Sequence, residues 1–295
     1  MQSNYLTPQV IASLANLELQ AKQVVEGFIS GLHKSPFHGF SVEFSQHRPY
    51  LPGDSLRFID WKVNARTDRY YIKQFEQETN LRSHILLDIS KSMQFGAKAM
   101  NKFQYASALA ASLAYLLIRQ KDAVGLSLFD SRIRSHLAPR SVRSFLPQIY
   151  SELEKAIPGE DTHISSVLHE IADKIHRRSL VIIISDLFDD PDEVLKGLRH
   201  FRHDLHEVLV FHLMDPHEMA MDYSGEVVFK DLESGERIKT QTAYIRESYQ
   251  EKINEFLEYY RVECSNNQIS YQLIQTDMSF DKALTQFFLK RKRLI

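Results

Sequence analysis

The chain has 295 residues, 43% of them hydrophobic, which is enough for one large globular domain or two smaller ones. Its 36 Lys and Arg nearly balance 38 Asp and Glu, and the net charge of -2 excludes a general electrostatic attraction to nucleic acid or anionic lipid. One cysteine, Cys264, excludes an internal disulfide; together with the absence of a signal-peptide pattern, it predicts a cytoplasmic protein.

The N-terminal part of the chain predicts one helix followed by irregular structure. Thr7 and Pro8 suit an N-cap and a first helical position, and apolar residues recur at helical spacing up to Gly31. The stretch after this helix contains the turn sequence PGD and short alternating runs such as YYIKQFEQE, which predict a few short strands. We therefore expect residues 1–80 to form an N-terminal segment with a helix and some β-structure.

From residue 81 onward, short apolar strands alternate with helices. The predicted strands are HILLDIS, AVGLSLF, SRIRSHLAP, SLVIIISD, HEVLVFHLMD and ISYQLIQT, and the predicted helices cover residues 101–119, 142–156, 163–176, 191–201 and 243–263. Continuously apolar strands between helices are typical of a parallel sheet covered on both faces. Residues 81–295 therefore predict an open, doubly wound, mostly parallel α/β domain, with a hairpin insertion near residues 225–240.

Polar residues at the ends of two predicted strands suggest a metal site. Asp88 ends the strand HILLDIS and is followed at alternate positions by Ser90 and Ser92; Asp186 ends SLVIIISD, and Thr162 precedes a helix between the two strands. Ligands of doubly wound sheets bind beyond the carboxyl ends of the strands, and these oxygens are the kind that Mg2+ prefers, with Mn2+ or Ca2+ as alternatives. Ser, Thr and Asp also serve as helix caps and turn residues. The combination of all five residues in this order favours the metal site.

Two parts of the sequence resemble known families. DISKSM, the threonine of GEDTHISSVL and the aspartate of VIIISDLF resemble the metal-ion-dependent adhesion site of von Willebrand factor A domains, although Glu160 and Asp161 replace the usual glycines before the threonine. The segment FSQHRPYLPGDSLRFIDWKVNARTDRYYIKQFEQE is similar to the signature of a bacterial family called domain of unknown function 58, which places it before a von Willebrand A-like domain. Many members have N-terminal membrane helices, whereas this chain resembles the short, soluble form.

The resemblance implies a protein-interaction module and not an enzyme. An acidic residue of a partner would complete the coordination of the metal, as in adhesion-type domains. The resemblance also implies the class of partner, because such proteins are commonly encoded beside MoxR-type AAA+ ATPases and are thought to act as their adaptors or substrate-recognition subunits. Composition and spacing alone do not indicate this partner.

The alternative function is a metal-dependent, nuclease-like hydrolase. Asp186, Asp189 and Asp190 would supply carboxylates to such a site, although the loop DLFDDPDE also suits a simple cap on the following helix. A phosphotransferase with an aspartate nucleophile would need a second carboxylate where Ser90 stands. The sequence contains no phosphate-binding loop, dinucleotide fingerprint or nucleophile elbow.

Histidine and cysteine give weaker candidates. His200, His203 and His206 are three residues apart, but the segment RHFRHDLHE crosses from a predicted helix into a predicted strand. We therefore expect the three rings to point in different directions and not to form a zinc site. Cys264 has no activating neighbour in the sequence and is expected to be a small buried residue.

Overall fold

The structure is a computed structural model that describes residues 6–33, 47–49, 66, 70–73, 81–96, 99–159, 164–223, 225–230 and 237–292. Contacts group residues 1–31 with residues 81–295 in one compact unit, and residues 32–80 form a second unit. The predicted N-terminal segment, residues 1–80, is therefore divided between the two units, and its helical part belongs with the α/β unit.

Two helices replace the single N-terminal helix predicted from the apolar periodicity. They are α1 (Pro8–Ala12) and α2 (Leu17–His33). The Ser13 hydroxyl donates to a backbone carbonyl in the last turn of α1, and the Asn16 side chain accepts a backbone N–H in the first turn of α2. These side chains end one helix and start the next, which the apolar spacing alone does not reveal.

Six strands form a mixed sheet at the centre of the first unit. They are β3 (Arg82–Asp88), β4 (Ala123–Phe129), β5 (Ile133–Arg140), β6 (Leu180–Ser185), β7 (Glu207–Met214) and β10 (Ser270–Gln275). Their order in the sheet is β10-β7-β6-β3-β4-β5. Neighbouring strands are parallel except for β4 and β5, which are antiparallel. The predicted doubly wound, mostly parallel α/β fold is confirmed.

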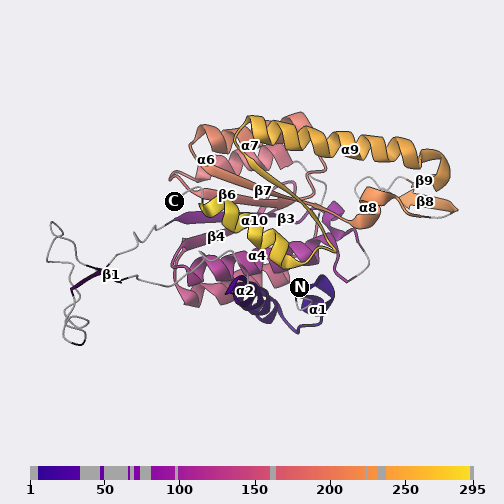
Figure 1. Ribbon diagram of the computed structural model, residues 1–295. Helices are drawn as coiled ribbons and strands as arrows, with labels where there is room; N and C mark the ends of the chain where they lie inside the picture. The colour runs from indigo at the N-terminus through magenta and orange to yellow at the C-terminus, as the bar shows by residue number, and fades with distance from the viewer. Residues whose placement is uncertain are drawn as a thin grey trace. The chain divides into compact units, whose positions relative to one another are not determined.

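Helices cover both faces of this sheet. The helices that follow the first strand are η3 (Lys91–Gln94), α4 (Lys102–Arg119), η4 (Arg143–Phe145), α5 (Leu146–Lys155), α6 (Ile164–Lys174), α7 (Pro191–His203), α8 (Pro216–Ala220), α9 (Thr242–Asn266) and α10 (Phe280–Lys292). Helix α4 packs against four of the parallel strands and α10 against β10, whereas α6, α7 and α9 lie on the opposite side of the sheet (Figure 1). The short helices η3 and α8 are not among the predicted helices, whereas η4 and α5 together occupy the predicted helix of residues 142–156.

Burial explains why the strands have these sequences. Every residue of β6 is buried, whereas β5 at the edge of the sheet alternates between half-buried and exposed residues. Strands buried on both faces are apolar throughout, and an edge strand with one wet face alternates. In β4, a side chain at Gly125 would place its Cβ 2.6 Å from the Leu137 carbonyl oxygen, where the pairing with β5 shifts register. Glycine permits this close approach.

Two further antiparallel strand pairs are not part of the main sheet. Strands β8 (Glu226–Lys230) and β9 (Arg237–Gln241) form an antiparallel insertion between β7 and α9, and β1 (His47–Pro49) pairs with β2 (Tyr71–Lys73) in the second unit. The signature segment, residues 44–78, lies largely outside the described residues. Within the described part of the chain, we find no helix that combines the length and apolarity needed to cross a lipid bilayer.

Candidate metal centre

The sheet reverses its direction of growth between β3 and β6. After β3 the chain adds β4 and β5 on one side, and then β6, β7 and β10 on the other. Leu87 pairs with Ile184, so Asp88 and Ser185 stand at the same level at the carboxyl ends of these neighbouring strands. In open α/β sheets, such a switch point creates the crevice in which ligands bind.

The Asp88 carboxylate is fully buried and held by two hydrogen bonds. Its Oδ1 accepts from the Ser90 backbone N–H at 2.8 Å, and its Oδ2 accepts from the Ser185 hydroxyl at 2.6 Å. Burial, and secondly the charge of Asp186, raise the pKa of Asp88 to about 7. The side chain is thus fixed in orientation while its negative charge is poorly stabilised, which favours a cation beside it.

Ser90 precedes the short helix η3 and Ser92 lies within it, and their hydroxyls are hydrogen-bonded to each other with the oxygens 3.0 Å apart. Ligands at neighbouring corners of an octahedron with bonds of about 2.1 Å are separated by about 3.0 Å, so this spacing fits two adjacent positions around Mg2+. In the described ranges, no three His, Cys, Asp or Glu side chains are grouped so as to hold a metal ion. A metal at this site would therefore need hydroxyl ligands in addition to carboxylates.

The third part of the predicted site cannot be placed, because Glu160, Asp161 and Thr162 lie outside the described residues. The helix after them, α6, begins at Ile164, whose backbone N–H donates to Oδ2 of Asp189 at 2.8 Å. Asp189 belongs to the loop after β6. The start of α6 is therefore attached to the loop that also carries the second aspartate of the predicted site.

That second aspartate, Asp186, is fully buried and ion-paired. Lys102 Nζ donates to Oδ2 of Asp186 at 2.7 Å and to Oε1 of Glu218 at 2.6 Å, and the Phe188 backbone N–H lies 3.4 Å from Oδ1 of Asp186. The structure thus brings Asp186 close enough to Asp88 to raise the pKa of Asp88. It also pairs Asp186 with a lysine that sequence reasoning missed.

Two signals in the sequence point to Lys102 and Glu218 in retrospect. A lysine in the first turn of an apolar helix opposes the helix dipole and needs a nearby anion. Asp215 and Glu218 have the spacing of a capping box, which predicts a helix start. The structure contains this box at α8: Asp215 accepts from the His217 N–H at 2.9 Å, and Glu218 Oε2 accepts from the Asp215 N–H at 2.9 Å.

The carboxylates of the hydrolase alternative have other partners. Asp190 caps α7 by accepting the backbone N–H groups of Asp192 at 3.0 Å and Glu193 at 3.1 Å. Asp189 holds the start of α6, and Asp186 is paired with a lysine. Asp190 therefore acts as the cap interpretation of DLFDDPDE predicts, and the three carboxylates do not gather in a metal-binding group within the described residues.

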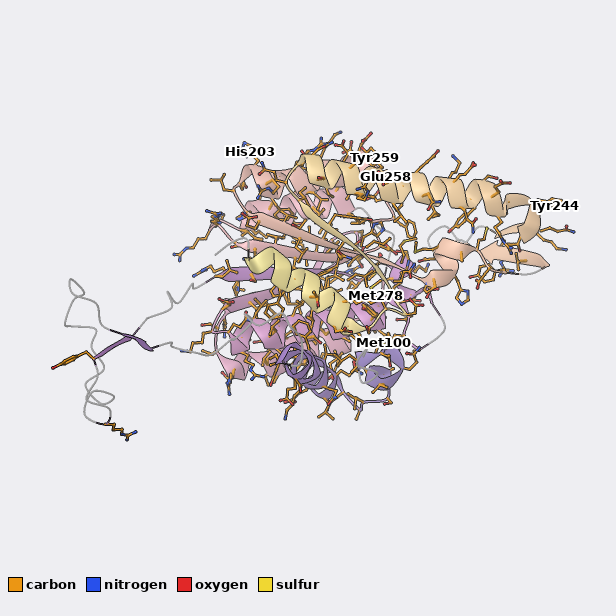
Figure 2. All side chains as sticks on the ribbon, in the orientation of Figure 1. Met100, His203, Tyr244, Glu258, Tyr259 and Met278 are labelled. Atoms are coloured by element: carbon orange, nitrogen blue, oxygen red, sulfur yellow. The ribbon has the colours of Figure 1, made fainter. Side chains whose placement is uncertain are left out.

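The histidines of RHFRHDLHE point in different directions, as predicted. The Nδ1 of His200 lies 2.9 Å from the Nδ1 of His169 on α6, whereas the His203 side chain is 86% exposed at the end of α7 (Figure 2). His206 is buried and accepts a backbone N–H at 3.2 Å. Cys264 is also buried, and this burial raises the pKa of its thiol to about 12, so the thiol is a packed core group and not a nucleophile.

A comparison with protein families identifies the chain. The family described as protein of unknown function DUF58 matches residues 46–257. The chain belongs to this family. The match covers residues 46–78 of the signature segment, so the resemblance drawn from that segment is confirmed at the level of the family.

The curated relatives of this DUF58 protein do not have an assigned function in their names. An uncharacterized protein of Mycobacterium tuberculosis and one of Mycobacterium bovis are each 29% identical over 231 residues. The alignment covers 77% of this chain and 72% of each relative. Most of the chain therefore has a counterpart in these proteins.

Solved structures support the fold. The conserved hypothetical protein BatB from Bacteroides thetaiotaomicron aligns with a TM-score of 0.51 and 18% identity, covering 72% of this chain and 99% of BatB. An aerotolerance-related membrane protein from Bacteroides fragilis aligns with a TM-score of 0.50 and 18% identity, covering 71% of this chain and 99% of that one. At this identity, the likeness concerns the fold alone.

Proposed function

We propose that this DUF58 protein is a metal-dependent protein-interaction module in which Asp88, Ser90, Ser92, Thr162 and Asp186 hold Mg2+. The observation that carries the proposal is the pair of serine hydroxyls 3.0 Å apart beside a buried carboxylate whose pKa is raised to about 7. This arrangement stands at the switch point of the sheet, and open α/β sheets in general bind their ligands at such a point. The protein-interaction role agrees with the von Willebrand A-like arrangement of the domain.

The residues of the proposed site have different roles in metal binding. Ser90 and Ser92 offer neutral oxygens, so they would neutralise none of the charge of a cation that they hold. Ser185 orients Asp88 by donating its hydroxyl hydrogen at 2.6 Å. Bound Mg2+ would supply a coordination position that a carboxylate of a partner protein can fill. An acidic partner residue would then bind only when the metal is present.

An exposed apolar residue lies on a loop that is hydrogen-bonded to the segment after β3, and we include it in the proposed partner surface. Ile157 is 81% exposed. Its loop is fixed to the segment after β3, because the Gly159 N–H donates to the Ile89 carbonyl at 2.9 Å and Gln94 Nε2 donates to the Pro158 carbonyl at 3.0 Å. An exposed isoleucine on a loop tied to the candidate metal loop suits a partner with an acidic residue and an apolar neighbour.

The partner proposed here is an AAA+ ATPase of the MoxR type, for which the protein would act as an adaptor or substrate-recognition subunit. This part of the proposal is supported by the family resemblance. A cytoplasmic location completes the proposal and is supported by the single cysteine. No observation favours the hydrolase as a second candidate, because Asp189 and Asp190 hold helix termini.

An affinity pull-down from native lysate tests the function. The wild-type protein is used with Mg2+ or with chelator, and the variants Asp88→Ala and Asp190→Ala are used with Mg2+; bound proteins are identified by mass spectrometry. Asp190→Ala is the matched control, since it removes a carboxylate that caps α7. We expect an AAA+ ATPase with wild type and Asp190→Ala in Mg2+, and its loss with chelator or Asp88→Ala.

Other results would contradict the proposal. Equal recovery of the ATPase in all four arms would place the partner surface away from Asp88. Absence of a partner in every arm, together with Mg2+-dependent cleavage of DNA or RNA by the purified protein, would favour the hydrolase. Calorimetry completes the test, because unchanged Mg2+ affinity in Asp88→Ala would remove the metal-site assignment.

A further inference from the structure

Lys102 is a fully buried lysine with four neighbours around its ammonium group. Besides its bonds to Asp186 and Glu218, its Nζ lies 4.8 Å from the ring centroid of Phe188 and 5.8 Å from that of Phe95. Burial lowers the pKa of Lys102, but the two carboxylates more than offset this, and the net direction is upward. The ammonium is therefore a permanent positive charge inside the protein.

This charge lies directly against the candidate metal centre. Lys102 shares the carboxylate of Asp186, one of the predicted ligands, which in turn lies beside Asp88. When ionised, Asp88, Asp186 and Glu218 carry three negative charges, and the ammonium leaves two of them uncompensated. A divalent cation at the serine loop would balance this remainder, but it would also repel the ammonium.

The other carboxylate bonded to Lys102 belongs to α8. Glu218 closes the capping box of that helix, and Asp215 at its start accepts from the Thr276 hydroxyl at 3.0 Å. The loop before α4 also approaches this point: a Cβ on Gly96, which has a φ of 113°, would lie 2.8 Å from Oδ2 of Asp215. Figure 1 shows α8 between the end of β7 and the hairpin of β8 and β9. Lys102 thus connects the candidate metal centre with the base of the insertion.

We infer that Lys102 sets the metal affinity of this site and couples metal occupancy to α8. The inference rests on the proposed metal-binding function. The Lys102 ammonium and the metal compete for the carboxylate of Asp186. Glu218 weakens this competition because it also binds the ammonium, on the side of α8. Repulsion by the metal would shift the ammonium from Asp186 toward Glu218, which strengthens the bond that holds α8.

The test compares two variants that break the same ion pair from opposite sides. Calorimetric titration with Mg2+ is performed on the full chain for wild type, Lys102→Met, Glu218→Gln and Asp88→Ala. Lys102→Met removes the competing cation, and we expect at least tenfold tighter binding, about 1.4 kcal/mol. Glu218→Gln leaves the ammonium to Asp186 alone, and we expect several-fold weaker binding.

Opposite directions are diagnostic, because both variants lose a buried ion pair and a merely structural role would change both affinities in the same direction. Changes in the same direction, or both within twofold of wild type, would overturn the inference. If Lys102→Met does not fold, Lys102→Gln and the milder Glu218→Gln carry the comparison. The latter retains a side-chain oxygen that can accept the Asp215 N–H.

The Asp88→Ala arm separates this inference from the proposed function. If Asp88→Ala loses Mg2+ binding while the Lys102 and Glu218 variants change the affinity in the same direction, the proposed metal site stands and the proposed role of Lys102 is wrong. If neither wild type nor Lys102→Met binds Mg2+, the proposed metal site and the role of Lys102 are both wrong. If Lys102→Met alone binds Mg2+, the result supports the inference.

Hydrogen exchange tests the coupling to α8. We expect Mg2+ to slow amide exchange in residues 217–221 of wild type and to leave it unchanged in Lys102→Met. Exchange in this segment of wild type that does not respond to Mg2+ would overturn the coupling.

Discussion

Replacing Asp88 by Asn removes the least compensated charge of the site and should stabilise the metal-free protein. The pKa of Asp88 is raised from 3.8 to about 7, and each unit corresponds to about 1.4 kcal/mol. Keeping Asp88 ionised above pH 7 therefore destabilises the fold by up to about 4 kcal/mol. Asn keeps an oxygen for the Ser90 N–H and presents an amide to the Ser185 hydroxyl. Allowing about 1–2 kcal/mol for weaker hydrogen bonds, we expect a gain of about 2–3 kcal/mol.

The sign of the effect depends on pH. Between pH 3.8 and about 7, the unfolded chain has released the Asp88 proton while the folded chain retains it. The wild type therefore loses stability relative to Asp88→Asn as the pH rises through this window, and the charge-dependent part of the difference disappears below about pH 4. Denaturant unfolding at pH 4, 6 and 8 in chelator measures this trend.

Mg2+ should reduce or reverse the stability advantage of Asp88→Asn over wild type. A ligand that binds only the folded state stabilises it by about 2.7 kcal/mol at 100 times its dissociation constant, and the variant lacks the charge that attracts the cation. Asp190→Asn serves as the control, because it alters an exposed cap and should not change the response to Mg2+. An Asp88→Asn protein that is less stable than wild type in chelator at pH 8 would refute the argument. It would mean that the hydrogen bonds of Asp88 outweigh the unfavourable burial of its charge.

Three further predictions concern the scaffold. Asp190→Ala should lower the free energy of unfolding by about 1 kcal/mol through loss of the α7 cap while Mg2+ affinity measured by calorimetry stays constant; lost affinity would restore Asp190 as a ligand. Gly197→Ala should lower the melting temperature despite better helix propensity, because its Cβ would lie 2.9 Å from the Cβ of Leu168; an unchanged or higher temperature would contradict this packing. Burial lowers the pKa values of His84 and His212 to about 4, so each histidine should reduce stability by about 1.4 kcal/mol per pH unit as the pH falls from 6.5 to 4. His84→Gln should remove its share of this slope in unfolding titrations, and an unchanged slope would show that His84 protonates within the fold.

The order of strands and helices in the α/β unit follows from local sequence. An apolar run without polar interruptions, such as LVIIIS in β6, is buried on both faces, and the alternating pattern of IRSHLAPR marks the edge strand β5. Breaks made by single side chains are harder to predict. Ser13 and Asn16 divide the N-terminal helix by hydrogen bonding to the backbone, although the apolar spacing continues across them.

The candidate site was predictable where its residues end strands. Asp88 and Asp186 follow apolar runs, and parallel strands end at the same edge of a sheet, so their proximity follows once the two strands are neighbours. Ser90 and Ser92 follow Asp88 by short steps along the chain. The placement of Thr162 remains a prediction, because that residue lies outside the described part of the chain.

By itself, the sequence determined the fold class, the family and the oxygen-rich character of the candidate site, because strand periodicity and residue types at strand ends are local properties. Only the tertiary structure decided which charges meet. Asp186 and Glu218 are separated from Lys102 by 84 and 116 residues along the chain, and their bonds to it form because the start of helix α4, the end of strand β6 and the start of helix α8 meet at one point. A buried ammonium is stable only beside anions. Because the chain contains many carboxylates, the packing of the fold decides which of them pair with Lys102.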